Sequence, residues 1–188
     1  HLINDGFDIG TDKNPYKNFV YTSFQEQATN VSHRRVATLV KKTGNSLLAK
    51  INGIIAADEA RHATAYSAFV QRIFELDPSQ MMTAFEDMMR RKIVMPAHFM
   101  RQTGDKAGEL WEHFSDAAQR TKVYTAQDYI DILSGLIKEW DIEHITDLNA
   151  AGEKARDYLM ALPDRLQRVT NRMKDPEKEY EFKWIGTH

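Results

Sequence analysis

The chain has 188 residues, of which 42% are hydrophobic and 28% charged. This length and composition predict a domain with a substantial core and exclude a disordered chain. Lysine plus arginine (25) nearly balance aspartate plus glutamate (27), which argues against a nucleic-acid binder. Cysteine is absent, so disulfides and thiolate metal sites are excluded. The longest aliphatic stretch lies near Ile54 and is too short to be embedded in a membrane. No initiator methionine precedes His1, so we expect a processed or partial chain.

Turn-forming residues divide the first part of the sequence into a loop and two long helices. Residues 1–15 are rich in glycine, asparagine and aspartate, which predicts an N-terminal loop. Helices are expected over residues 16–42 and 46–76, separated by Gly44 and Asn45. Helices this long are typical of a bundle. The second carries an apolar stripe that we expect to face the core, made of Leu47, Ile51, Ile54, Ile55, Ala65, Phe69, Ile73 and Phe74.

Shorter helices are predicted in the middle of the chain. Asp77 is placed to cap the next helix and Pro78 to open it. Its methionine-rich side is typical of an adaptable core rather than of a cofactor site. That side consists of Met81, Met82, Phe85, Met88 and Met89. A loop is expected around residues 104–108, followed by a helix around residues 110–118.

The last third of the chain continues in the same way. Thr125 and Asp128 resemble a capping box for the helix that follows them. A helix is expected over residues 150–162, and Pro163 is expected to open a separate one that ends near residue 173. Residues 180–185 alternate weakly and predict a short strand or an extended tail. The chain is therefore predicted to be nearly all α.

The sharpest chemical signal lies inside the second long helix. Glu59 and His62 are three residues apart and so project from one face of the helix. A carboxylate with an imidazole suits iron or manganese, with coordination positions left open for oxygen. On this motif alone a surface glutamate beside a helical histidine is the simpler interpretation. The apolar residues on both sides favour a buried pair, and a buried pair needs compensation that a metal would supply.

The preceding helix offers a third ligand, Glu26. The short connection makes the two helices antiparallel neighbours, and Glu26 and Glu59 lie at similar distances from the turn. One glutamate facing a Glu-x-x-His motif is half of the di-metal site of four-helix carboxylate proteins. Asp141 and His144 are a loose match to a second such motif, and we expect them in a solvated loop.

Other polar residues near this pattern each allow two interpretations. Asp58 could orient an imidazole, or form a surface salt bridge. Thr29 could place its hydroxyl near bound oxygen, or bond to a carbonyl of its own helix. His33 either supports the site or is an ordinary helical histidine. The basic residues 90–92 fit either an acidic partner or a solvated helix face.

Segments across the whole chain resemble the soluble acyl-[acyl-carrier-protein] desaturases. These segments are FVYTSFQE at 19–26, IAADE at 55–59, FELDP at 74–78, MPAH at 95–98, YTA at 124–126 and WI at 184–185. The resemblance implies a ferritin-like helical bundle, of which this chain is the second half, in a homodimer. It also implies a di-iron centre that activates O2 with two electrons, commonly from a ferredoxin. The implied reaction removes two hydrogens from a saturated acyl chain on acyl carrier protein and leaves a cis double bond.

The resemblance also assigns roles to residues. Glu59 resembles the carboxylate that bridges the two irons, and Glu26 and His62 resemble terminal ligands of one iron. Thr29 matches a threonine near the oxygen site, and Asp58 matches an aspartate just outside the ligands.

The sequence departs from the family pattern in several places. The family's first glutamate ligand and first Glu-x-x-His lie upstream of His1, with part of the acyl tunnel. Gln27 stands where the family commonly has arginine. Ile9 and Asn18 replace small or cyclic residues near the tunnel, so acyl length and double-bond position are not predicted.

We therefore expect one ferritin-like domain over residues 1–188, with an N-terminal loop (1–15), a metal-ligand hairpin (16–76), further helices (77–175) and a tail (176–188). The expected function is an acyl-[acyl-carrier-protein] desaturase of fatty acid biosynthesis, located in the cytoplasm of a bacterium or in the plastid stroma of a plant or alga. One alternative is a non-catalytic, desaturase-like scaffold subunit. Others are a di-iron site completed by two-fold self-association, and other di-iron chemistry such as hydroxylation.

Overall fold

A computed structural model describes residues 9–95 and 109–173, with the backbone alone for residues 109–111. Every regular element in these residues is helical, so the all-α prediction is confirmed. The loop expected at 104–108 and the strand expected at 180–185 lie outside the described residues. The elements are α2 (Pro15–Lys42), α3 (Ser46–Leu76), α4 (Pro78–Arg91), α5 (Glu109–Arg120), α6 (Ala126–Glu139), the 3-10 helix η2 (Ile142–His144) and α7 (Ala150–Thr170).

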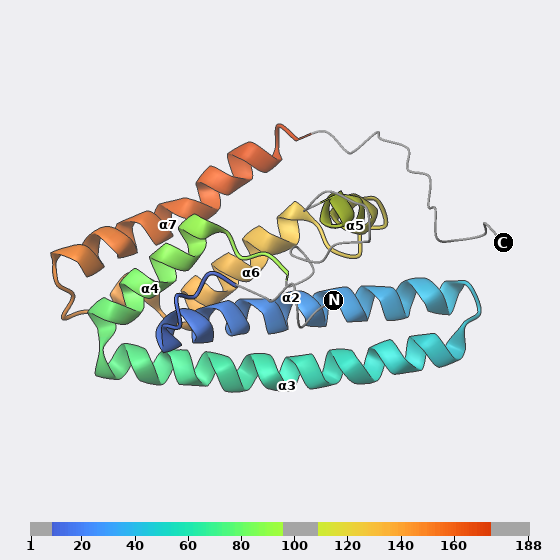
Figure 1. Cartoon of the computed structure of the whole chain (residues 1–188), viewed down its shortest axis with the longest axis horizontal. Coiled ribbons are helices and arrows are strands. Elements are labelled where there is room, and N and C mark those ends of the chain that lie inside the picture. Colours follow the sequence, from blue (N-terminus) through green and yellow to red (C-terminus); the bar gives the residue numbers. More distant parts are fainter. Residues whose placement is uncertain (1–8, 96–108, 174–188) are drawn as a thin grey trace.

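The two longest helices form an antiparallel hairpin along one side of the molecule (Figure 1). Helices α4 and α6 pack against α2, and α7 packs against α4 and α6. Among the described residues, no helix combines the length and the apolar character needed to cross a bilayer.

Short polar side chains and one glycine set the helix ends where the sequence predicts them. The Asn14 side chain accepts hydrogen bonds from the first backbone N–H groups of α2, and Asn45 does the same for α3. Gly44, with φ of +85°, adopts the left-handed conformation that ends α2. The capping box of Thr125 and Asp128 is confirmed at the start of α6. The hairpin therefore has fixed ends and a tight connection.

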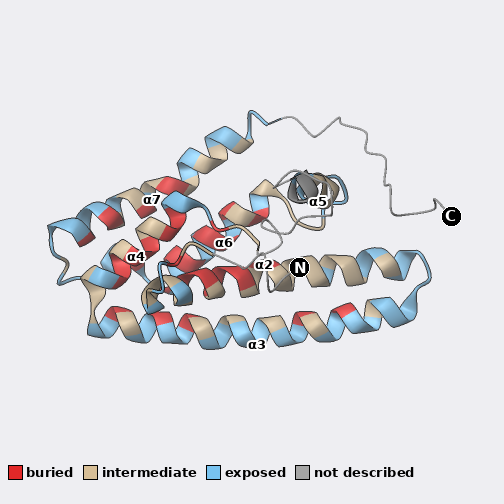
Figure 2. Cartoon of the chain, in the orientation of Figure 1, coloured by how far each residue is buried: buried red, intermediate tan, exposed pale blue. Residues whose placement is uncertain are grey.

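The core lies between α4, α6, α7 and the adjoining part of the hairpin. The methionine-rich side of α4 is fully buried, with none of its residues more than 3% exposed, so the core prediction for this stripe is confirmed. Leu133, Leu136 and Leu159 meet it from α6 and α7. Figure 2 shows the buried residues on the facing sides of these helices.

The prediction that the apolar stripe of α3 faces the core is wrong for most of its members. Leu47, Ile51, Ile54 and Phe69 are 68%, 44%, 55% and 51% exposed, and of the stripe only Phe74 is buried. The side of α3 that meets its neighbours carries Asn52, Ala56, Ser67, Val70 and Phe74. Among the described helices, α2 is the main neighbour of α3, so only a narrow strip of α3 is covered. Amphipathic periodicity identifies an apolar face but not what packs on it.

The prediction that Pro163 opens a separate helix is also wrong. Helix α7 runs without a break from Ala150 to Thr170, with Pro163 inside it. A proline in a helix interior costs about 3 kcal/mol relative to alanine. Leu159 and Leu162 are buried before and beside the proline, and Leu166 packs on the same core after it. Burial on both sides of Pro163 offsets the lost hydrogen bond and keeps the helix continuous.

Candidate metal centre

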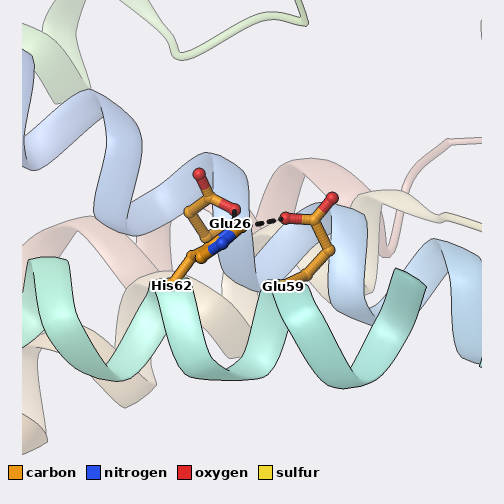
Figure 3. Close-up of side chains that lie close together, drawn as sticks. All are labelled: Glu26, Glu59 and His62. Carbon is orange, nitrogen blue, oxygen red and sulfur yellow. Dashed lines mark hydrogen bonds and ion pairs between the residues drawn. The ribbon is translucent and has the colours of Figure 1, made fainter. Parts of the chain in front are cut away.

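The structure brings Glu26, Glu59 and His62 together across the hairpin (Figure 3). One ligand atom of each lies within 4.8 Å of those of the other two. Nδ1 of His62 is 3.3 Å from Oε2 of Glu26 and 3.4 Å from Oε2 of Glu59. Glu26 comes from the middle of α2, and the other two come from the middle of α3. The convergence expected from the spacing of these residues is therefore present.

The cluster lies at the edge of the hairpin seam. The side chains of Glu26 and Glu59 are each 19% exposed, whereas that of His62 is 55% exposed. The prediction of a buried pair is therefore wrong for the imidazole, which is exposed, and the Glu59 carboxylate is only half-buried. The reason is the uncovered outer face of α3, on which His62 borders the exposed apolar stripe.

The electrostatics of the cluster show a shortage of positive charge. Burial and, after it, the facing carboxyl group of Glu59 raise the pKa of Glu26, and His62 lowers it by less, so that the pKa is about 7. The pKa of His62 is raised by its hydrogen bond to Glu59 and by the charge of Glu26, despite some desolvation. Two carboxyl groups this close resist losing their last proton. A cation bound between them would take the place of that proton.

The donor set fits a hard divalent cation. Two carboxylates and one imidazole are the ligand types that iron and manganese accept, and no thiolate competes. Three protein ligands leave further coordination positions open on an ion held here. The residues present therefore fit iron, with room for other ligands.

The side chains of Thr29 and Asp58 have hydrogen-bond partners other than the side chains of the cluster. The Thr29 hydroxyl donates to the backbone carbonyl oxygens of Gln25 and Glu26 in its own helix, at 3.0 and 3.1 Å. Asp58 pairs with Arg61 on the exposed side of α3. The structure therefore has the carbonyl bond expected as one alternative for Thr29 and the surface salt bridge expected as one alternative for Asp58. A catalytic role for either residue stays a prediction.

The other polar residues singled out in the sequence are paired within the chain. Arg90 binds Glu86 and lies over the ring of Tyr158. Arg91 bridges Asp12 and Asp87, so this basic run is largely neutralised. Separately, His144 bonds to Asp141 at the surface, in η2 rather than in an irregular loop. The solvated position expected for that pair is confirmed.

Sequence reasoning missed two links around the hairpin. Arg35 forms a two-pronged ion pair with Asp128, with N–O distances of 2.5 and 2.6 Å, and so ties α2 to α6. These residues are 93 positions apart, and no local pattern connects them. Across the hairpin, Asn30 bonds to the backbone oxygen of Ala56 and Asn52 bonds to His33, close to the ligands. Their positions could have been noticed, because they continue the antiparallel register that pairs Glu26 with Glu59.

Comparison with known proteins decides the family. A family model described as fatty acid desaturase matches residues 1–186. The chain belongs to the fatty acid desaturase family.

Curated members of this family match almost the whole chain. The chain is 48% identical to a chloroplastic stearoyl-[acyl-carrier-protein] 9-desaturase of Spinacia oleracea and 49% identical to one of Olea europaea. It is 48% identical to a chloroplastic acyl-[acyl-carrier-protein] desaturase of Cucumis sativus. Each match covers 98% of this chain but only 47 or 48% of the relative. The chain thus spans about half the length of the curated desaturases it matches.

Proposed function

We propose that this chain provides the metal-binding hairpin of an acyl-[acyl-carrier-protein] desaturase, which puts a cis double bond into a saturated acyl chain. The observation that carries the proposal is the meeting of Glu26, Glu59 and His62 in a chain of the fatty acid desaturase family. The relatives' names support acyl carrier protein as the carrier of the substrate.

The three ligands would hold iron, with Glu59 shared between two ions and Glu26 and His62 on one of them. When bound, two irons would supply the two-electron activation of O2 that removes two hydrogens from adjacent carbons. Thr29 is proposed to present its hydroxyl near the oxygen site after releasing its backbone partners. Asp58 is proposed to orient an imidazole, which requires its pair with Arg61 to open.

Two irons need more ligands than these three. Di-iron bundles use a second glutamate and a second Glu-x-x-His from another pair of helices. The exposed stripe of α3, which includes Ile54 and Phe69 and borders His62, offers the apolar surface on which such a pair would pack. We propose that the centre is completed on this side, within one ferritin-like domain to which residues 1–188 belong.

The same proposal extends to the partners and the location. The electron donor is proposed to be of the ferredoxin type, and the assembly a homodimer. The relatives are chloroplastic, which supports the plastid stroma for a plant or algal source, and we propose the cytoplasm for a bacterial one.

The exposed stripe also favours a second candidate, a desaturase-like scaffold subunit that binds no iron and packs a partner chain on α3. The two candidates differ in iron content, because only the desaturase needs Glu26 and Glu59 to bind a cation. If a second copy of this chain completed the di-iron centre, the protein would bind one iron per chain, as expected for a site on a two-fold axis.

Turnover of stearoyl-acyl carrier protein tests the proposal. The purified protein, supplied with Fe2+, reduced ferredoxin and O2, is expected to yield a product lighter by two hydrogens in mass spectrometry. Glu59→Gln should abolish the product. Glu86→Gln is the control and should leave the product unchanged. The Glu86 side chain is 20% exposed, close to the exposure of Glu59, but it lies outside the cluster.

Intact mass and iron analysis of the same sample identify what completes the centre. A mass of 21.7 kDa with one iron per chain indicates two copies, and a larger mass indicates a longer polypeptide. An iron-free protein in fixed stoichiometry with another chain would support the scaffold. An iron-loaded protein with no turnover would contradict the desaturase.

A further inference from the structure

The end of the hairpin nearest its turn has no fully buried residue that could fix its register. Not one residue from 29 to 51, all of them described, is buried. Figure 2 shows this end, called here the open half, as intermediate and exposed surface. The ligands Glu26 and Glu59 lie outside it, in the adjoining part of the hairpin, so its alignment contributes to whether they stay face to face.

Directional polar bonds cross the hairpin in and beside the open half. Nδ2 of Asn30 donates to the backbone oxygen of Ala56 at 2.6 Å. Nδ1 of His33 lies 2.9 Å from Oδ1 of Asn52. The amide nitrogen of Asn52 donates to the backbone oxygen of Leu48, which leaves Oδ1 as the acceptor and makes the His33 Nδ1–H the donor. Asn52 is only 7% exposed, so its end of this bond is shielded from water.

These bonds continue the register of the ligands. From Glu26, the next residues at the seam are four and then three positions further along α2, at Asn30 and His33. From Glu59, their partners are three and then four positions back along α3, at Ala56 and Asn52. On the other side of the ligands, Phe19 packs against Tyr66 with ring centroids 6.2 Å apart. The ligands therefore lie between an aromatic contact and two polar ones.

We propose that Asn30, His33 and Asn52 form a polar clamp that positions Glu26 opposite Glu59 and His62. The clamp depends on the metal centre proposed above, which it serves through alignment and not through contact. A slip of one residue along either helix moves a ligand by about 1.5 Å and turns it by about 100°. The bond from Asn30 to a backbone carbonyl resists such a slip because it is directional and fixed to the partner helix.

The variant Asn30→Leu tests the clamp, because leucine keeps the size of the side chain and favours the helix while the donor is lost. We expect Co2+, a redox-stable substitute for Fe2+, to bind about tenfold more weakly by calorimetric titration. The midpoint of thermal unfolding should stay close to that of the wild type. Asn30→Gln keeps an amide donor and should recover part of the affinity. Hydrogen exchange over residues 46–56 should be about fivefold faster in Asn30→Leu.

Thr38→Ala is the matched control, because Thr38 lies in the open half and its hydroxyl bonds to the backbone oxygen of Arg34 in its own helix. It should leave Co2+ binding and exchange unchanged. Equal Co2+ affinity in Asn30→Leu and the wild type would overturn the clamp, as would an equal loss in Thr38→Ala. If the wild type binds no Co2+, the proposed metal centre is wrong. The hydrogen-exchange measurement over residues 46–56 then tests the clamp by itself. Faster exchange in Asn30→Leu than in the wild type supports the clamp as a device that aligns the helices, and an unchanged rate overturns it.

Discussion

The two halves of the hairpin are built from the same two helices but are held in different ways. In the core half (residues 15–28 and 52–76), Val20, Phe24, Val70 and Phe74 are between 0 and 7% exposed. In the open half (residues 29–51), no residue is fully buried, and a polar bond from His33 crosses to α3. Apolar residues occur in both halves, so the difference in burial comes from which helices lie beside each half and not from the sequence pattern. The ligands lie where the two halves meet.

Removing a large side chain from each half should produce the greatest contrast. Phe24 is 1% exposed and packs against Tyr129 with ring centroids 4.5 Å apart, so Phe24→Ala should lower the free energy of unfolding by about 3–5 kcal/mol. Leu39 in the open half is 41% exposed, and Leu39→Ala should cost less than about 1 kcal/mol. Urea denaturation measures both. Similar losses at the two positions would mean that the open half is covered in solution.

The link between Arg35 and Asp128 is where the open half is anchored to the core helices. Burial alone would raise the pKa of Asp128, but the hydrogen bonds from Arg35 and Thr125 outweigh it and leave the pKa below its usual value. A carboxyl group whose pKa is lowered by folding stabilises the fold above its unfolded pKa. That stabilisation is lost as the pH falls through the folded pKa. Asp128→Asn should therefore cost about 2 kcal/mol at neutral pH.

The pH dependence of unfolding sharpens this prediction. The gap in stability between Asp128→Asn and the wild type should be full at pH 6 and should shrink as the pH falls below about 4. Asp131→Asn on the same helix is the control, because Asp131 is exposed and should change stability by no more than about 0.5 kcal/mol. A gap that stays constant down to pH 2 would show that the charge of Asp128 does not provide the stabilisation.

The smallest effect is expected on the outer face of α3. Ile54 is 55% exposed, so Ile54→Gln should change the free energy of unfolding of the isolated chain by less than about 0.5 kcal/mol. The same variant should weaken any assembly that covers this face, which sedimentation or light scattering detects. A large loss of stability in a chain that remains monomeric would contradict the exposure of Ile54.

Local rules explain what could be predicted from the sequence. Caps and turn residues place the ends of α3 at Ser46 and Leu76, as expected. The short turn then makes α2 and α3 antiparallel, and counting from the turn brings Glu26 to Glu59. This part of the site could be predicted because it lies within one hairpin and depends on no distant contact.

The features that could not be predicted depend on the surroundings of a helix. The exposure of Ile54 follows from which helices lie beside α3, and periodicity does not contain that information. Pro163 has a strong local tendency to begin a helix, but the burial of Leu159 and Leu162 overrides it. The pairing of Arg35 with Asp128 joins distant segments and has no sequence signature.

Equilibrium dialysis against Fe2+ without oxygen tests the central claim most directly, namely that Glu26, Glu59 and His62 form a metal centre. The wild-type chain should bind Fe2+ in a saturable way, and Glu86→Gln should bind it equally well. Glu26→Gln and Glu59→Gln should each weaken binding at least about tenfold while the helical content is unchanged. Undiminished binding in both of these variants, or no saturable binding by the wild type, would contradict the claim.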